Sequence, residues 1–386
     1  MNCEELFLSK FNTAPEFKSF VPYRVCTLGA HIDHQLGHIN GFAIDKGMSL
    51  CYSPSDCVKL YSTNFDGEIR FNIDEELNKS FNWGDYAKSA LWSLKDSGYK
   101  ITTGFNGVIE GTMPVGGLSS SAGVTILYIN AFCRLNNITL SENELIEIAH
   151  KAENKFIGLK CGKLDQSCEV LCKKDNMLHI DTLDSSAENI TIPQKARPFE
   201  IGVFFSGLEH SLVNSNYNLR TEELKYACDI ISEKSGKYYG DKLRYIPYEI
   251  YAEYESALPE NVKKRCVHFY SENQRAIEGT KLFKEGNIEK YGKLVTESGY
   301  SSIYNYEAGS PELIRLYEIL KDTKGVYGTR FSGAGFKGCC LALVDPEYKK
   351  EIEDTVKEKY LAAFPEHKEK YTTTFCKTAD GFGGII

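Results

Sequence analysis

The sequence predicts a two-domain protein in which β-strands and α-helices alternate. Its 386 residues exceed what a single hydrophobic core usually serves. Neither a long disordered linker nor an internal repeat interrupts the alternation. We expect the boundary near residues 190–200, where the polar segment TIPQKARP precedes the apolar run FEIGVFF, which predicts domains at 1–195 and 196–386.

The first domain begins with β-rich segments, and its helices carry recognisable start signals. Residues 40–52, 57–73 and 104–110 are expected to be strands. A helix is predicted from Ser119 to about Leu135. Ser141 and Glu144 form a capping-box pattern that opens another helix, through about Phe156.

The second domain is expected to open with a buried strand and to continue mainly as helix. Its expected elements are a strand over 199–206, a helix over 217–235 ended by Gly236, helices between 260 and 320 broken at Gly286 and at 309–311, and strands over 326–331 and 339–344.

Composition narrows the function. The net charge of -8 argues against general affinity for nucleic acid. No apolar run approaches the ~20 residues of a membrane span, and no signal peptide is evident, so we expect a cytoplasmic protein. Thirteen cysteines, many in apolar stretches and none in a C-x-x-C pair, indicate reduced core residues.

The segment PVGGLSSSA at residues 114–122 lies at a predicted strand-to-helix junction. Glycines allow successive N–H groups to converge, and a helix N-terminus favours phosphate. Serine hydroxyls can bind phosphate or Mg²⁺. The segment is not a Walker A loop, because no Gly-Lys-Ser/Thr follows at the required spacing. The alternative is a tight turn with serine helix caps.

Two other segments offer charged groups and close backbone approach. In GTRFSGAGFKGCC at 328–340, Gly333, Gly335 and Gly338 permit contact with a ligand or a facing loop, although in isolation a hairpin with a flexible turn explains the segment better. PYRVCTLGAHIDHQLG at 22–37 supplies Arg24, His31 and Asp33. Arginine suits a transferring phosphoryl group, and an aspartate accepts hydrogen bonds from sugar hydroxyls.

A fourth segment, CGKLDQ at 161–166, places Asp165 after a glycine turn. This carboxylate can accept a proton from a hydroxyl that attacks ATP. By itself Asp165 is equally well a helix cap.

Together these segments resemble the GHMP kinase family, in order and over essentially the whole chain. Arg24, Gly29, His31, Asp33, GLSSSA and CGKLDQ are similar to the galactokinase branch. The resemblance implies an α+β, two-domain fold, with an N-terminal domain like ribosomal protein S5 domain 2 and a ferredoxin-like C-terminal domain. The active site would lie between them.

The departures from the branch suggest the substrate. Tyr23, Cys26, Ala30 and His34 replace its Gly, Asn, Glu and Tyr. That Glu meets the C6 end of the sugar, where a substrate carboxylate would be repelled. Two charges ~4 Å apart cost about 4 kcal/mol at an effective dielectric of about 20, roughly a thousandfold in binding. Ala30 therefore suits a uronic acid. The alternative is a less selective galactokinase.

Longer segments resemble plant-type galacturonokinases, which implies an ATP-dependent 1-kinase for D-galacturonate. They are GAHIDHQ (29–35), NYNLR (216–220), HFYSENQRAIEG (268–279), SGYSSIYNYEAG (298–309) and GVYGTRFSGAGFKGCC (325–340).

The resemblance also implies roles for single residues. Asp165 and Arg24 would be catalytic. The sugar would meet Ala30, His31, Asp33, Gly162 and Tyr217. ATP would meet Trp83, Gly116, Gly117, Leu118, Ser119, Ser120 and Ser121, and Mg²⁺ would be held by Ser120 or Ser121 with Glu153. His34 and Tyr217 are the candidates for the C6 carboxylate. For Glu153 and Trp83 the alternatives are an exposed helix acid and a core anchor.

Two other functions stay open. One is a kinase for galactose, N-acetylgalactosamine or arabinose. The other is a catalytically inactive sensor that binds sugar and ATP. Sugar and ATP are the expected partners, with neither nucleic acid nor membrane, and the sequence leaves the oligomeric state undetermined.

Overall fold

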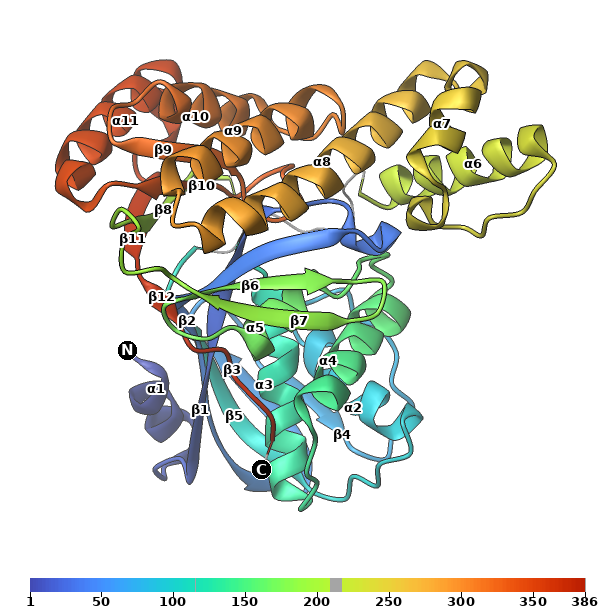
Figure 1. The fold of residues 1–386 in the computed structure, drawn as a ribbon. Helices are drawn as coiled ribbons and strands as arrows, with labels where there is room; N and C mark the ends of the chain where they lie inside the picture. The colour runs from blue at the N-terminus through green and yellow to red at the C-terminus, as the bar shows by residue number, and fades with distance from the viewer. Residues whose placement is uncertain (115, 209–216, 386) are drawn as a thin grey trace.

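The computed structural model describes residues 1–114, 116–208 and 217–385, and for Tyr217 the backbone only. Its elements form a lower body around a large sheet and an upper body around a smaller one (Figure 1). Within the described ranges no helix is long and apolar enough to cross a membrane. The expected α+β arrangement of strands and helices is confirmed.

Eight of the described strands form the first sheet, in the order β4-β3-β5-β2-β6-β7, with β1 and β12 also paired to β2. Only β3 and β5 pair in parallel. The strands are β1 (Phe17–Leu28), β2 (His38–Ser55), β3 (Cys57–Ser62), β4 (Ile69–Asn72), β5 (Gly104–Gly111), β6 (Asn176–Asp181), β7 (Ser186–Thr191) and β12 (Thr378–Ala379).

The helices of the first half follow the start signals in the sequence. Ser141 and Glu144 form the predicted capping box in full, and the helix that they open continues as a π-helix over Ala152–Ile157. The helices are α1 (Cys3–Phe11), α2 (Asp85–Asp96), α3 (Ser120–Leu135), α4 (Glu142–Lys151) and α5 (Leu164–Leu171).

The second half places a four-stranded antiparallel sheet, in the order β11-β8-β10-β9, beneath a layer of helices (Figure 1). Its strands are β8 (Glu200–Phe205), β9 (Val326–Phe331), β10 (Cys339–Val344) and β11 (Thr372–Cys376). Its helices are α6 (Tyr217–Ser235), α7 (Tyr248–Tyr254), α8 (Glu260–Lys284), α9 (Ile288–Tyr304), α10 (Pro311–Lys321) and α11 (Lys349–Ala363). The predicted breaks are confirmed: Gly286 lies between α8 and α9, and Gly309 and Ser310 precede α10, which begins at Pro311.

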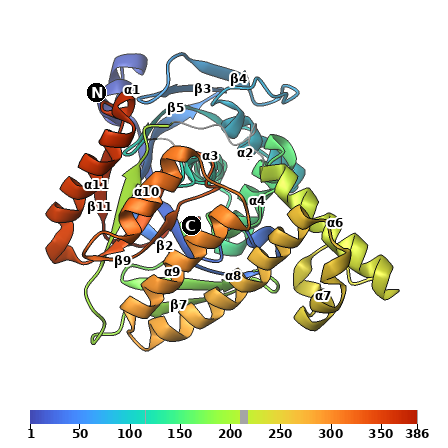
Figure 2. The same cartoon turned by 90° about the horizontal axis from the view of Figure 1, so that it is seen from above.

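Strand β1 is the central element of the fold, because both halves of the chain pack against it. Its last eight residues, from Val21 to Leu28, are all buried. Helices α3 and α5 contact β1 from the first half, and α8 and α9 contact it from the second. Seen from above, α8 and α9 extend across the first sheet (Figure 2). Arg24 and the segment after Leu28 are therefore held at the junction of the two bodies.

The C-terminal segment returns to the first body. It runs down from β11, pairs through β12 with β2, and bridges Leu140 to Ile385 (Figure 1). The boundary predicted between 195 and 196 falls between β7 and β8 and stays a prediction. Eleven of the thirteen cysteines are buried, as expected of small core residues.

Candidate active site

A cavity of about 880 Å³ lies where the conspicuous segments of the sequence converge. Its walls come from β1 and the turn after it, the loop before α3, the start of α5, and the glycine-rich turn between β9 and β10. Among the residues predicted from the sequence, those lining it are Arg24, Ala30, His31, Asp33, Trp83, Gly116, Gly117, Ser119, Ser120, Ser121 and Asp165. Segments more than 300 residues apart in the sequence thus enclose one space.

Arg24 and Asp165 form an ion pair on the floor of the cavity. Nε and Nη2 of Arg24 both lie 2.7 Å from Oδ1 of Asp165. The arginine side chain is 3% exposed and the aspartate 28%, so the guanidinium lies beneath a carboxylate that faces the cavity. Because a buried charge needs a partner, this contact also holds Asp165 in place. Nη1 of Arg24 donates to the carbonyl of Gly117 at 3.0 Å, which connects the pair to the loop before α3.

The two glycine-rich loops pack backbone against backbone. A Cβ added to Gly338 would lie 2.6 Å from the carbonyl carbon of Gly116, and one added to Gly333 would lie 3.0 Å from Cα of Gly117. The Ser332 hydroxyl donates to the Gly117 carbonyl at 2.5 Å. The glycines therefore serve the approach of the facing loop, which was one of the two readings of this motif. The segment is also the turn of a hairpin, because β9 and β10 pair antiparallel on either side of it.

The serine loop has a strained backbone and an unsatisfied hydroxyl. Ser119 precedes α3 with φ +65°, a left-handed conformation, and makes no side-chain cap. Its buried Oγ has no hydrogen-bond partner among the described residues. Strain and an orphaned buried donor at a helix N-terminus are typical of a ligand-binding site. The alternative of a simple serine cap is wrong for Ser119.

Glu153 lies in the π-helix beside the serine loop, and it does not line the cavity. It is 2% exposed, so the alternative of an exposed helix acid is wrong. The carboxylate accepts from Gln166, and Ser121 lies near enough for its side chain to lower the pKa of this carboxylate. Burial, and after it the Asp165 carboxylate, raise the pKa of Glu153 to about 7. Carboxylate and hydroxyl oxygens are the hard donors that Mg²⁺ prefers, so this pair fits the ion.

At the other end of the cavity, Ala30, His31 and Asp33 share one wall. His31 has φ +66° and its ring stacks on Tyr306, with centroids 4.3 Å apart. Asp33 accepts from the amide of Leu164 at 3.3 Å. A Cβ on Gly162 would lie 2.4 Å from the Asp33 carboxylate, so only glycine leaves room for it. Burial, and after it Asp165, raise the pKa of Asp33 to about 6.

In the cavity wall, the ring of Trp83 stacks on Phe65. Three other predicted residues, Leu118, His34 and Gly162, do not line the cavity. The Leu118 side chain belongs to the hydrophobic core. His34 is buried in the turn after His31, with Nδ1 3.2 Å from the Gln35 amide nitrogen. Gly162 packs under Asp33. The side chain of Tyr217 lies outside the described part of the chain.

Sequence reasoning missed several residues of the cavity wall. Lys79 and Lys337 add two cations, and Tyr306 supports His31. Lys337 stands inside the quoted glycine-rich motif, where a cation next to a phosphate-binding loop is a readable signal. Lys79 is held through its ammonium, which donates to the carbonyl of Ile157 at 2.9 Å, and no local pattern marks it.

Comparisons with known proteins agree with this geometry. Family models described as "GHMP kinases N terminal domain" and "GHMP kinases C terminal" match residues 85–173 and 280–362. A galacturonokinase of Arabidopsis thaliana is 39% identical over 369 residues, covering 89% of this chain and 87% of the relative. A galactokinase of Pyrococcus furiosus is 35% identical over 363 residues, covering 94% and 97%.

Solved structures are similar over nearly the full length. A Lactococcus lactis galactokinase complexed with galactose has a TM-score of 0.90 and 28% identity, covering 98% of this chain and 97% of that one. A Methanococcus jannaschii mevalonate kinase, 20% identical with a TM-score of 0.65, shares the fold. The chain belongs to the GHMP kinase family. Within it, the chain falls in the galactokinase branch, and it is a phosphotransferase that uses an alcohol group as acceptor.

Proposed function

We propose that the protein is an ATP- and Mg²⁺-dependent sugar 1-kinase that converts D-galacturonate to galacturonate 1-phosphate. The observation that carries the proposal is Ala30, which lines the cavity beside His31 and Asp33. The galactokinase pattern has a glutamate at this position, and its carboxylate would repel the C6 carboxylate of a uronic acid. The similarity to a galacturonokinase supports the same substrate.

Asp165 accepts the proton of the anomeric hydroxyl as that oxygen attacks the γ-phosphorus of ATP. The bond from that phosphorus to the bridging β–γ oxygen breaks, and ADP leaves with the bond's electrons. Arg24 orients the aspartate through two contacts and stabilises the charge that develops on the transferred group. Phosphoryl transfer depends mainly on positioning and electrostatics. The buried guanidinium of Arg24, which makes two contacts with Asp165, supplies both.

The loop from Gly116 to Ser121 and the N-terminus of α3 cradle the triphosphate. Trp83 lies at the adenine. Ser120 or Ser121 would hold Mg²⁺ together with Glu153, whose pKa the nearby Ser121 lowers. A bound Mg²⁺ would neutralise phosphate charge. Asp33 and His31 orient the sugar hydroxyls.

The test is ADP release at equal concentrations of D-galacturonate and D-galactose, with D-glucuronate and L-arabinose as controls. Strong turnover of galacturonate with little of galactose is the expected result. A preference for galactose would contradict the assignment and leave a galactokinase, which the likeness to the galactose-bound structure supports as the second candidate.

Two variants separate charge from size at position 30. Ala30→Glu is expected to lower kcat/KM for galacturonate by roughly a thousandfold. Ala30→Gln has nearly the same volume without the charge, so it is expected to lose far less. Equal losses in the two variants would show that steric fit, rather than repulsion, sets the preference.

An Asp165→Asn variant tests whether the protein acts as an enzyme or as a sensor. Loss of a proton acceptor is expected to lower kcat by about 10²–10⁴-fold while both ligands still bind. A wild-type protein that binds both ligands without turnover would instead favour the sensor.

A further inference from the structure

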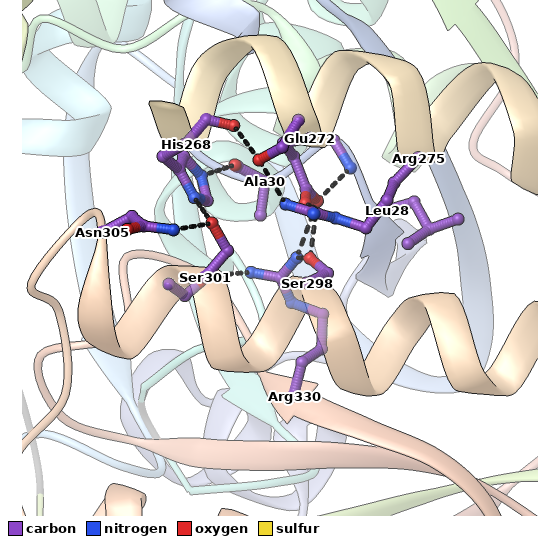
Figure 3. Close-up of polar contacts among 12 residues, drawn as sticks. Leu28, Ala30, His268, Glu272, Arg275, Ser298, Ser301, Asn305 and Arg330 are labelled. Atoms are coloured by element: carbon purple, nitrogen blue, oxygen red, sulfur yellow. Dashed lines mark hydrogen bonds and ion pairs between the residues drawn. The ribbon is translucent and has the colours of Figure 1, made fainter. Parts of the chain in front are cut away.

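The backbone on both sides of Ala30 is held by two residues of helix α8, one helical turn apart. Glu272 accepts from the amide of Gly29 at 2.7 Å. Nε2 of His268 lies 3.1 Å from the carbonyl oxygen of Ala30 and, because a carbonyl only accepts, it donates. Figure 3 shows both side chains directed from α8 at this short segment. The position of Ala30 in the cavity wall is thus set by the second half of the chain.

A polar cluster lies next to these contacts, and its residues do not line the cavity. We call His268, Glu272, Arg275, Ser298 and Arg330 the α8 cluster (Figure 3). Glu272 and Arg330 are both 0% exposed. Glu272 accepts from Arg275 at 2.8 Å and from Ser298 at 2.6 Å, and Nη1 of Arg330 lies 3.4 Å from its Oε1.

The α8 cluster carries more positive than negative charge. Two arginines face one glutamate, and although burial opposes it, Arg275 and Arg330 lower the pKa of Glu272 to about 2, so the glutamate is ionised. Burial lowers the pKa of His268 to about 4, so at neutral pH the histidine adds no charge. One positive charge of the α8 cluster is left over, and its effect reaches the cavity wall: burial, and after it Arg330, lower the pKa of His31 well below its usual value.

Arg330 also connects the sugar end of the cavity to the phosphate end. Its Nη2 donates to Ser302 on α9, and its Nε donates to the carbonyl of Phe331. The next residue, Ser332, donates to Gly117 in the loop before α3. A displacement of Arg330 would therefore move both ends of the cavity relative to each other.

We propose that Arg330 is a positioning residue that determines specificity for an anionic sugar. With Glu272 and His268 it fixes the backbone at Ala30, and it supplies a buried positive charge that the carboxylate of the substrate balances. Where a glutamate occupies position 30, that side chain can balance the charge. With alanine at position 30, the buried positive charge is left for the carboxylate of the ligand to balance. This inference rests on the proposed function, because it names what favours the uronate carboxylate at the same site.

The test compares kcat/KM for D-galacturonate and D-galactose in three variants. Arg330→Met removes the charge at similar size, and we expect the galacturonate-to-galactose ratio to fall about tenfold, through the KM of galacturonate. Arg330→Lys retains the charge and should restore most of the ratio. Glu272→Gln increases the net positive charge of the cluster. Its loosened Gly29 contact is expected to weaken binding of both sugars without lowering the galacturonate-to-galactose ratio.

Equal losses for the two sugars in Arg330→Met would overturn the proposal, because a purely structural role predicts them. A fall of the ratio in Glu272→Gln would also overturn it, and this readout remains if Arg330→Met does not fold. The proposed function is judged separately, from the ratio of the wild-type protein. A wild type that prefers galactose contradicts that function. The Arg330 proposal is judged only from how the galacturonate-to-galactose ratio changes between the wild type and each variant.

Discussion

At the scale of single residues, the site depends on carboxylates that the fold keeps partly out of water. Asp33 and Glu153 are both buried near Asp165, and the pKa of each is raised. Asp165 itself remains the most accessible of the three, paired with Arg24. The three carboxylates therefore differ in environment: burial disfavours the charged form of Asp33 and Glu153, whereas Asp165 faces the cavity in an ion pair with Arg24.

The raised pKa of Asp33 predicts a pH dependence of sugar binding. Above its pKa of about 6 the carboxylate is ionised and accepts from sugar hydroxyls, and below it the protonated form accepts poorly. We therefore expect sugar affinity to fall as the pH is lowered through 6. Calorimetry with sugar alone, without nucleotide or Mg²⁺, measures this directly. Asp33→Asn should bind more weakly and lose the step, and a step that persists in this variant would assign the titration to another group.

At the scale of elements, the site is built where loops of two sheets touch. The loop before α3 and the turn between β9 and β10 meet through glycines, and Arg24 and Ser332 both donate to the Gly117 carbonyl. This leaves Ser119 and the start of α3 in a fixed position with respect to the ion pair. Small spacing errors between these elements are costly, because transfer requires reacting atoms within about 3–3.5 Å.

Gly338→Ala tests the contact between the loops. Its Cβ would meet the Gly116 backbone at 2.6 Å, so we expect the KM for ATP to rise about tenfold or more. Gly98 is a matched control, because its φ of +90° is close to the +96° of Gly338 and no atom lies within 4 Å of a Cβ added to it. Both variants should lose about 1 kcal/mol of stability from strain. If Gly98→Ala changes the KM for ATP as much, the loop contact is not the cause.

At the scale of the whole molecule, the chain crosses between its two bodies more than once. The C-terminal segment returns from β11 to the first sheet and then reaches the end of α5. There the amides of Gly381, Phe382 and Gly383 donate to the carbonyls of Cys172, Glu169 and Val170. These bonds satisfy carbonyls at the C-terminal end of α5, whose first turn carries Asp165.

Removal of residues 380–386 is therefore expected to weaken the first body as well as the site. The deletion removes six hydrogen bonds: the three to α5, the two between Leu140 and Ile385, and the one from the Lys174 amide to Asp380. At about 1 kcal/mol each they predict a loss of about 6 kcal/mol of stability, and kcat should fall because α5 is less firmly held. Urea unfolding and steady-state kinetics measure the two effects. Gly381→Ala keeps the segment but places a Cβ 2.5 Å from the Val170 carbonyl oxygen, so it should show the same changes in smaller measure. Unchanged stability in both variants would refute this role.

Much of the molecule could be predicted from the sequence because the signals are local. The capping box at Ser141, helix α6 with its bounds at Tyr217 and Ser235, and the breaks after α8 and α9 all follow from patterns spanning a few residues. The family and the fold followed from motifs of the same short range. Ala30 was recognisable as a departure from one of them.

The tertiary structure alone decided how these segments meet. The burial of Glu153, the contact between the glycine loops, and the contact of Glu272 with Gly29 each depend on packing between segments that no local pattern relates. Local periodicity and capping set which elements form. They carry no information on which distant side chain balances a buried charge, since that depends on the packing of both bodies around β1.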